Sequence, residues 1–426
     1  MSIKGKAAAV FIAASAVLPC VALAQHPRYR VEIIPRVPGV EVGHGHRAIN
    51  DNGWVVGEFA APTPADVYNY RSYLYRPGIG SIDLGAPPGL PCVLVTDVSN
   101  DGRVVGSASD AFISSGYNQH TWRWENGVFT VWPQMVAGRG TAPGRTNDSG
   151  RMVGSANDGS FIGQEAVEFL EDQTLSPILP HVQGYNSAID INNENQVLGN
   201  EINGVFVRDL DTGEHIILPS PPEPYVMFTA WAINDLGDVV GSARVAQHAE
   251  GSRAAVYING QGWTLLPPRA RRNIAVSINN QRQVVGNSRE NAGAIGDHGW
   301  MWTQADGIVP LQDLIDDPAE TWRVAGVSDI NNNGAILAGL MHEDTGDGAA
   351  AVLAPIGTTP ACDDIDFNND GLFPDNADLA DFLSVFGGGA CSTGACGDID
   401  FNNDQLFPDN ADITAFFAVF GGGACP

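Results

Sequence analysis

Short runs of alternating apolar and polar residues, separated by turn residues, fill most of this chain. One stretch shows the pattern clearly, with runs at residues 186–192, 196–201, 205–210 and 215–218. Such alternation is typical of half-buried β-strands. Asn, Asp and Gly residues follow the first and third runs and supply the positive φ of tight hairpins. The stretch therefore predicts a unit of four antiparallel strands.

The same unit recurs along the chain, and a phrase of about ten residues marks each copy. The first copy reads Ala-Ile-Asn-Asp-Asn-Gly-Trp-Val-Val-Gly. The seven copies occupy residues 48–57, 97–106, 145–154, 190–199, 232–241, 277–286 and 329–339. Four strands in roughly 45 residues form one blade of a β-propeller. The sequence thus predicts an all-β fold, a seven-bladed β-propeller over residues 25–355, in which the Asn-Asp-x-Gly segments are structural turns.

The last unit lacks a fourth strand, while the N-terminus supplies a strand without a partner. Residues 349–353 form the third strand of the last unit and are followed by Pro355. Before the first unit, residues 30–34 read Arg-Val-Glu-Ile-Ile. Pairing these two segments would leave no open sheet edge. We therefore predict a propeller closed by its N-terminal strand.

Tryptophans mark the second half of several units, as at Trp122, Trp124, Trp300 and Trp302. With the Ile-Asn-x-x-Gly-x-Val-Val-Gly phrase, they make residues 30–355 resemble the HAF family of bacterial extracellular repeat proteins. Residues 205–218 lack the tryptophan, which affects the packing of that blade rather than the fold. The family has no established activity, so the resemblance implies an architecture without a reaction.

A sharp change in composition marks a second domain at residues 362–426, after a linker at residues 356–361. Residues 361–426 hold 12 aspartates and no basic residue. Two copies of Asp-Phe-Asn-Asn-Asp begin 34 residues apart. Oxygen side chains at loop positions 1, 3 and 5, with a carbonyl at position 7, suit calcium. Solvated turns without a cation are the alternative.

The closing carboxylate of each loop comes one residue later than position 12 of the usual calcium loop, so an earlier aspartate competes with it. The predicted calcium ligands are Asp366, Asn368, Asp370, Leu372, Asp375 and Asp378 in the first loop and Asp400, Asn402, Asp404, Leu406, Asp409 and Asp412 in the second. Gln405 replaces the glycine that favours the sharp turn, which weakens the second site.

A helix is predicted after each loop. Apolar residues recur at helical spacing, and triple glycine follows. These residues are Leu379, Phe382, Leu383 and Phe386 in the first helix and Ile413, Phe416, Phe417 and Phe420 in the second. This duplicated loop and helix, enclosed by cysteines, resembles a dockerin domain of the cysteine-flanked type. The resemblance implies calcium-dependent folding of a small α-helical domain and docking to a cohesin-like or cell-surface protein.

Four cysteines lie in this tail, at Cys362, Cys391, Cys396 and Cys425. Three pairings are possible. Because the duplicated segments place two cysteines in each copy at equal separation, we expect one disulfide within each copy. Cys92 has no partner in the sequence and is interpreted as a partly buried thiol in a loop.

Residues 1–24 predict a secretory signal peptide: Lys4 and Lys6 precede a short apolar run and an Ala-Leu-Ala site. An exported chain permits disulfides, and we expect it to be secreted or held at the cell surface. The mature chain would carry 20 arginines against 49 acidic residues, which disfavours nucleic acid as a partner. No later segment is apolar enough to predict a membrane span.

Longer, variable joints between the second and third strands, and between units, lie together on one rim of the ring. Loops on a rigid scaffold often carry binding groups, and aromatic residues there suit glycan or protein ligands. The candidate rim residues are Tyr68, Tyr70, Tyr117, Tyr185, Tyr225 and Trp322. Capping of blade ends is the structural alternative. His44 and His46 are spaced like two metal ligands, but no third candidate ligand lies at a spacing typical of a metal site.

The sequence best fits a secreted, non-catalytic propeller that binds a ligand on its rim and is displayed through a calcium-dependent tail. One alternative is an extracellular hydrolase acting on polysaccharide, which would need carboxylates converging on the channel or rim. Another is a structural envelope protein whose rim binds nothing. Neither a nucleophile elbow nor a metalloprotease motif is present.

Overall fold

The structure, a computed structural model, describes most of the chain between residues 27 and 420. The described ranges are residues 27–40, 45–61, 69–110, 118–159, 163–179, 185–202, 204–245, 251–289, 298–316, 321–356, 365–370, 375–394, 396–397, 399–401 and 410–420. The predicted signal peptide lies outside these ranges.

Strands dominate the chain up to Ile356, and they fall into groups of four. The first three groups are β2 (Ala48–Ile49), β3 (Val55–Ala61), β4 (Asn69–Arg76) and β5 (Gly80–Asp83); β6 (Cys92–Val98), β7 (Val104–Ser109), β8 (His120–Glu125) and β9 (Val128–Val131); and β10 (Thr141–Thr146), β11 (Met152–Asn157), β12 (Gln164–Phe169) and β13 (Leu175–Pro177). The next three are β14 (Asn186–Ile191), β15 (Gln196–Glu201), β16 (Gly204–Asp209) and β17 (His215–Ile217); β18 (Tyr225–Ile233), β19 (Val239–Val245), β20 (Ser252–Ile258) and β21 (Gly262–Leu265); and β22 (Arg272–Ile278), β23 (Val284–Arg289), β24 (His298–Thr303) and β25 (Gly307–Pro310). The last, after the 3-10 helix η2 (Leu311–Leu314), combines β26 (Trp322–Ile330), β27 (Ile336–His342), β28 (Gly348–Ile356) and β1 (Arg28–Ile33).

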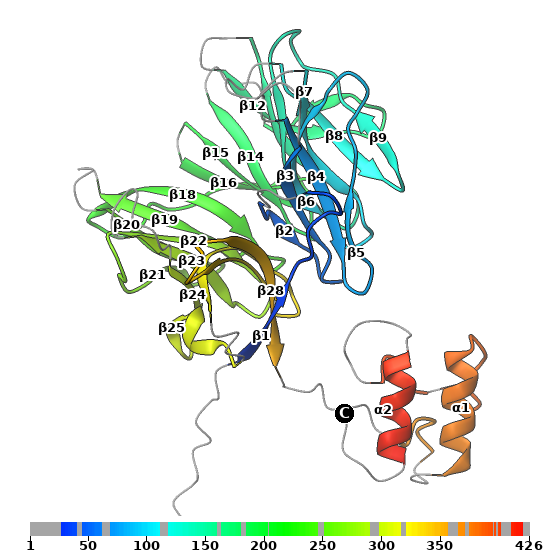
Figure 1. Cartoon of the computed structure of the whole chain (residues 1–426). Coiled ribbons are helices and arrows are strands. Elements are labelled where there is room, and N and C mark those ends of the chain that lie inside the picture. The colour runs from blue at the N-terminus through cyan, green and yellow to red at the C-terminus, as the bar shows by residue number, and fades with distance from the viewer. Residues whose placement is uncertain are drawn as a thin grey trace, which may run out of the picture.

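Each group is a four-stranded antiparallel sheet that resembles a propeller blade, and the fold is that of a β-propeller (Figure 1). A single parallel bridge between Ser252 and Arg272 joins the fifth and sixth sheets. In the fourth unit the strands match the predicted runs to within one or two residues. Local alternation and turn residues were therefore sufficient to place these strands.

The N-terminal strand completes the last sheet, as the sequence predicts. β1 pairs antiparallel with β28, from Arg28 opposite Ile356 to Ile33 opposite Ala351. Tyr29 is fully buried there, and its hydroxyl donates to the sulfur of Met301 at 3.3 Å. The two ends of the propeller chain thus share one sheet, and β1 covers the edge of β28 as the outer strand of the last unit.

The glycine that closes each repeat phrase is required by packing. A Cβ on Gly106 would lie 2.1 Å from the carbonyl oxygen of Leu94 and 2.5 Å from the Trp122 ring. A Cβ on Gly286 would lie 2.2 Å from the Trp300 ring. These rings lie directly opposite the glycines on the third strand. The glycine and the tryptophan of the repeat are therefore two parts of one contact.

The C-terminal region is small and helical. α1 (Asn376–Phe386) and α2 (Asn410–Phe420) begin 34 residues apart, as the duplication predicts. The rings of Phe382 and Phe416 stack with centroids 3.9 Å apart in the shared core. Neither of these helices is long and apolar enough to cross a membrane.

One prediction about this region is wrong. Cys391 is bonded to Cys396, with Cα atoms 5.7 Å apart, and not to Cys362. Because the two copies share one core, the end of the first copy meets the start of the second. Cys362 and Cys425 lie outside the described residues. Leu383 and Phe417, at equivalent positions of the two helices, are each 46% exposed.

Candidate functional site

A closed ring of hydrogen bonds connects neighbouring units at the turns between first and second strands. In each turn the fourth residue of the repeat phrase, an Asp or Asn, accepts a backbone N–H from the preceding unit through its side-chain Oδ1, at 2.7–3.0 Å. The seven acceptors are Asp51, Asn100, Asp148, Asn193, Asp235, Asn280 and Asn332. The last link runs from Asn332 N–H to Asp51, which closes the circle. The repeated turn is thus structural, as predicted, and it also bonds unit to unit.

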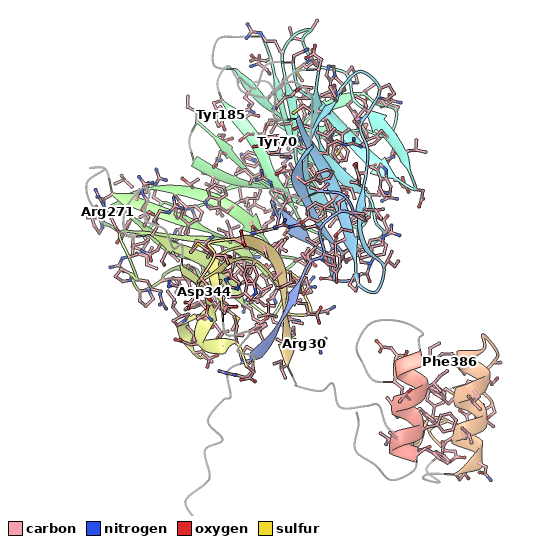
Figure 2. The ribbon with its side chains drawn as sticks, viewed as in Figure 1. Arg30, Tyr70, Tyr185, Arg271, Asp344 and Phe386 are labelled. Carbon is pink, nitrogen blue, oxygen red and sulfur yellow. A yellow bond between two sulfur atoms is a disulfide. The ribbon has the colours of Figure 1, made fainter. Side chains whose placement is uncertain are left out.

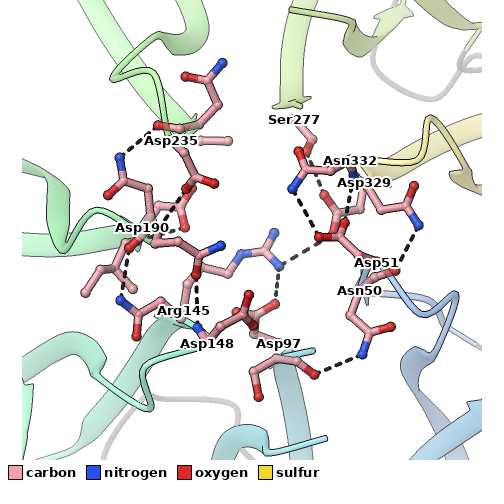
Figure 3. Close-up of a pocket in the computed structure, with 18 of the residues that line it drawn as sticks. Asn50, Asp51, Asp97, Arg145, Asp148, Asp190, Asp235, Ser277, Asp329 and Asn332 are labelled. Atoms are coloured by element: carbon pink, nitrogen blue, oxygen red, sulfur yellow. Dashed lines mark hydrogen bonds and ion pairs between the residues drawn. The ribbon is translucent and has the colours of Figure 1, made fainter. Parts of the chain in front are cut away.

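Inside this ring lies a depression of about 160 Å³, lined by residues from all seven units (Figure 3). The first residue of each repeat phrase lies on the first strand of its unit and precedes Ile-Asn in five of the seven units. These residues are Ala48, Asp97, Arg145, Asp190, Ala232, Ser277 and Asp329. Five of the seven are polar or charged, so the centre of the propeller holds one arginine among three aspartates.

Arg145 is the cation of this centre. Its Nη1 lies 2.9 Å from Asp97 Oδ1 and 3.8 Å from Asp329 Oδ2. The side chain points toward the middle of the ring (Figure 3). One guanidinium therefore compensates carboxylates that come from distant repeats.

Each of these carboxylates also bonds the first strand of the next unit. Asp97 Oδ2 accepts from Thr146 N–H at 2.9 Å, and Asp190 Oδ2 accepts from Ile233 N–H at 2.9 Å. Asp329 Oδ2 accepts from Ile49 N–H at 3.1 Å. The remaining oxygens are engaged as well: Asp190 Oδ1 by its neighbour Ile191, and Asp329 Oδ1 by Ser277 and Ile330. The aspartates hold the inner strands together in pairs.

Burial changes the protonation of this cluster. It raises the pKa of Asp190 to about 7, although the charge of Arg145 opposes the rise. Burial also raises the pKa of Asp329, and the charge of Arg145 again opposes the rise. For Arg145, burial alone would lower the pKa, but the charges of Asp97, Asp329 and Asp190 outweigh it and keep the pKa above its ordinary value. Asp190 therefore titrates near neutral pH while the arginine stays charged.

Chemically, this centre is better suited to holding strands than to turning over a substrate. Carboxylates do converge on the axis, which is the feature that the hydrolase alternative needs. However, both oxygens of Asp97, Asp190 and Asp329 already accept from the protein. This cluster was not predicted from the sequence, although the repeats contain a signal for it. The first position of the repeat phrase varies in charge while its neighbours repeat.

A second buried contact joins the first and last units. Ser328 Oγ lies 2.6 Å from His46 Nδ1, and burial, with the nearby charge of Arg47, lowers the pKa of His46 to about 4. The imidazole packs against Gly339, whose Cβ, if present, would lie 2.6 Å from Nε2. His46 is therefore a neutral residue of the seam between units. His44 lies outside the described residues.

The described rim candidates all lie at the rim ends of strands. Tyr185 is 47% exposed, and Tyr70 and Tyr225 are half-buried. Tyr70 and Tyr185 are labelled in Figure 2. Trp322 packs edge-on against His342 with centroids 5.0 Å apart, which fits the capping alternative. Tyr68 and Tyr117 lie outside the described residues. The rim is at the opposite end of the ring from the central depression.

Part of the predicted first calcium loop is described. Asp366 Oδ1 and Asn368 Oδ1 both accept from Asp370 N–H at 3.0 Å, so these two oxygens face one point. Asp378 is fully buried and accepts from Asn368 N–H and Asp375 N–H. Asp375 caps α1.

Leu372, Asn402, Asp404, Leu406 and Asp409 lie outside the described part of the chain. Asp412 is fully buried in α2, and Asp400 is buried near the start of the second copy. Within the described ranges no group of three or more His, Cys, Asp or Glu side chains is placed to hold a metal. The two calcium loops therefore stay predictions.

Cys92 is a free thiol that is fully buried at the start of β6. It lies opposite Ser109 in the sheet and not in a loop. We predicted a partly buried thiol, but Cys92 is fully buried because the segment forms an inner strand of its unit. The thiol is an apolar packing group there.

Comparisons with known proteins give the fold only in outline. No family model matches the chain, and no curated protein matches it. Among solved structures, TolB from Acinetobacter baumannii has a TM-score of 0.42 at 12% identity, over 72% of this chain. The chain covers 65% of that TolB chain, just under two thirds. The β-propeller domain of the Trilobed protease from Pyrococcus furiosus has a TM-score of 0.44 at 9% identity, over 76% of this chain and 93% of that domain.

These similarities assign no function, because the identities are very low and the TM-scores are below 0.5. The propeller assignment depends on the strands and registers of this chain. The HAF-like and dockerin-like motifs remain resemblances.

Proposed function

We propose that this chain is a secreted, non-catalytic, seven-bladed propeller that presents its variable rim to a glycan or protein ligand. The supporting observation is that the charged groups at the centre are committed to the fold. Both oxygens of Asp97, Asp190 and Asp329 accept from the protein, and Arg145 compensates their charge. A ligand would have to break bonds between units to use them. The opposite rim, where aromatic side chains meet longer joints, is the better place for recognition.

The rim proposal is tested with the mature chain, residues 25–426, on glycan and protein arrays. We expect a ligand whose binding is lost in Tyr185→Ala/Tyr225→Ala. The matched control is Val128→Ala, which truncates a side chain 65% exposed beside the Asn126–Gly127 turn at the other end of the ring. Binding that is equal in all three proteins contradicts the rim assignment. Absence of any ligand favours the structural envelope protein.

The hydrolase stays a second candidate, because carboxylates do converge on the axis and Asp190 has a pKa of about 7. Two carboxyl groups with different protonation are what glycoside hydrolysis requires. Incubation of the mature chain with a panel of polysaccharides tests it. Activity that disappears in both Asp97→Asn and Asp190→Asn, in folded variants, would support the hydrolase over the binding module.

The tail is proposed as a calcium-dependent docking domain that holds the protein at a cell surface or in a secreted complex. The facing oxygens of Asp366 and Asn368 and the buried Asp378, which lacks a cationic partner among the described residues, fit a hard cation. Leu383 and Phe417 expose apolar surface at equivalent positions of the two helices. These residues are suited to contact a cohesin-like partner. Calcium titration by calorimetry, followed by partner capture with and without chelator, tests this part.

A further inference from the structure

Six arginines gather on the rim where the fifth and sixth units meet. They are Arg244, Arg253, Arg269, Arg271, Arg272 and Arg289. Arg244 on β19 lies opposite Ser252 on β20, Ser252 bridges to Arg272 on β22, and Arg272 lies opposite Arg289 on β23. At about 4.8 Å between strands, the backbones of Arg244 and Arg272 are about 10 Å apart. We call this set the arginine edge.

The loop that carries Arg269 and Arg271 and leads into Arg272 is held in a defined shape. Buried Asn273 accepts from Arg269 N–H at 3.0 Å and donates to the Ala270 carbonyl at 2.6 Å. The neighbouring segment packs tightly on it, since a Cβ on Gly251 would lie 1.7 Å from the carbonyl oxygen of Arg271. The arginines therefore project from an organised loop, and Arg271 marks its position on the outer margin in Figure 2.

Many of the arginines outside this edge are engaged in ion pairs. Ten arginines elsewhere pair with a carboxylate within 4.0 Å, namely Arg28, Arg30, Arg47, Arg71, Arg103, Arg123, Arg145, Arg151, Arg282 and Arg323. In the described part of the chain, Arg244, Arg269 and Arg272 are exposed and pair with none. In a protein with a net charge of −27, three exposed arginines with no carboxylate partner among the described residues are suited to bind an external anion.

An aromatic residue of the rim lies beside the same edge. Tyr225 on β18 lies opposite Val245, the residue after Arg244. Along the rim the order is thus tyrosine, arginine, serine, arginine and arginine on five adjacent strands. A guanidinium forms paired hydrogen bonds with a carboxylate, and a tyrosine ring offers a flat apolar face to a sugar.

We propose that the arginine edge binds an anionic polysaccharide whose sugars carry carboxylates, that is, a polyuronate. This inference rests on the proposed rim function and gives its ligand class. A repeating polymer matches charges spaced along several strands better than a single small anion does. An acidic protein segment is the competing ligand. The Asp-rich tail of the same molecule is poorly placed for this, because β28 ends at Ile356 on the opposite end of the ring from the rim.

The experiment measures binding of fluorescently labelled polygalacturonate to the mature chain by anisotropy. The test variant is Arg244→Gln/Arg269→Gln/Arg272→Gln. The control variant is Arg30→Gln/Arg323→Gln, which removes two exposed arginines that pair with Glu32 and Glu343. We expect the test variant to bind roughly tenfold or more weakly, because each lost contact is a charge-assisted hydrogen bond. The control should bind within about twofold of the native protein, and binding should weaken with salt.

Three results would overturn the inference. They are equal binding by the test variant, equal binding of fully methyl-esterified polygalacturonate, and equally tight binding of poly-aspartate. Each of these three results contradicts the polyuronate proposal without excluding another ligand on the rim. If a neutral glycan or a protein binds through Tyr225 while polygalacturonate does not, the rim function stands and the polyuronate proposal falls. Melting temperatures of both variants are measured first and should match the native protein, since all five positions are on the surface.

Discussion

Replacing Arg145 with methionine tests the interpretation of the propeller centre. The substitution keeps an unbranched side chain but removes the charge that lies 2.9 Å from Asp97 and 3.8 Å from Asp329. The remaining carboxylates would then be buried without a cation. Breaking a buried ion pair in this way costs about 3–5 kcal/mol. For a propeller of about 330 residues, that is a fall of roughly 4–7 °C in melting temperature.

The loss should depend on pH. In the native protein, burial raises the pKa of Asp190 to about 7 from an ordinary value of 3.8. Between these values the folded state binds a proton that the unfolded state does not, so this group's contribution to stability is lost as pH rises toward 7. Without Arg145 the folded pKa values of Asp190 and Asp329 should rise further. We therefore expect a small loss at pH 5 and nearly the full loss at pH 8.

Thermal and urea unfolding at pH 5 and pH 8 measure this difference. The control is Arg323→Met, because Arg323 and Glu343 form a half-exposed pair worth at most about 1 kcal/mol. Equal losses at the two pH values, or no loss at pH 8, would refute the assignment of Arg145 as the compensating charge. The result bears on function too. If the protein keeps its stability without Arg145, the charged groups of the centre are not needed to hold the strands and are available to a ligand.

Three further predictions concern the ring and the tail. Deleting residues 28–35 should destabilise the whole propeller by several kcal/mol, because it removes the strand paired with β28 and buried Tyr29; an unchanged thermal midpoint would contradict the closure. Chelation of calcium should loosen the tail and lower its helical circular dichroism; an unchanged spectrum with no heat of calcium binding would remove the calcium loops. Non-reducing peptide mapping should find Cys391 linked to Cys396; a Cys362–Cys391 peptide would instead restore one bridge in each copy.

Much of the fold was predictable because its determinants are local. The alternation that defines β14 to β17 and the Asn-Gly turns lies within single repeats. The closing strand was predictable by counting, since one unit lacked a strand that the N-terminus could supply. The packing reason for the repeated glycine was not, because the ring that lies against Gly106 comes from Trp122 on another strand.

The central cluster and the arginine edge needed the tertiary structure. Asp97, Arg145 and Asp329 are up to 232 residues apart in sequence and become neighbours only when the ring closes. Likewise, Arg244 and Arg272 belong to different units and are aligned by the bridge at Ser252. Sequence spacing also could not choose among three disulfide pairings, because the choice depends on which chain ends meet in space. By itself, then, the sequence determined the strands, the number of repeats and the tail helices. The tertiary structure decided which charges face one another, because electrostatic contacts depend on distances that only the closed ring sets.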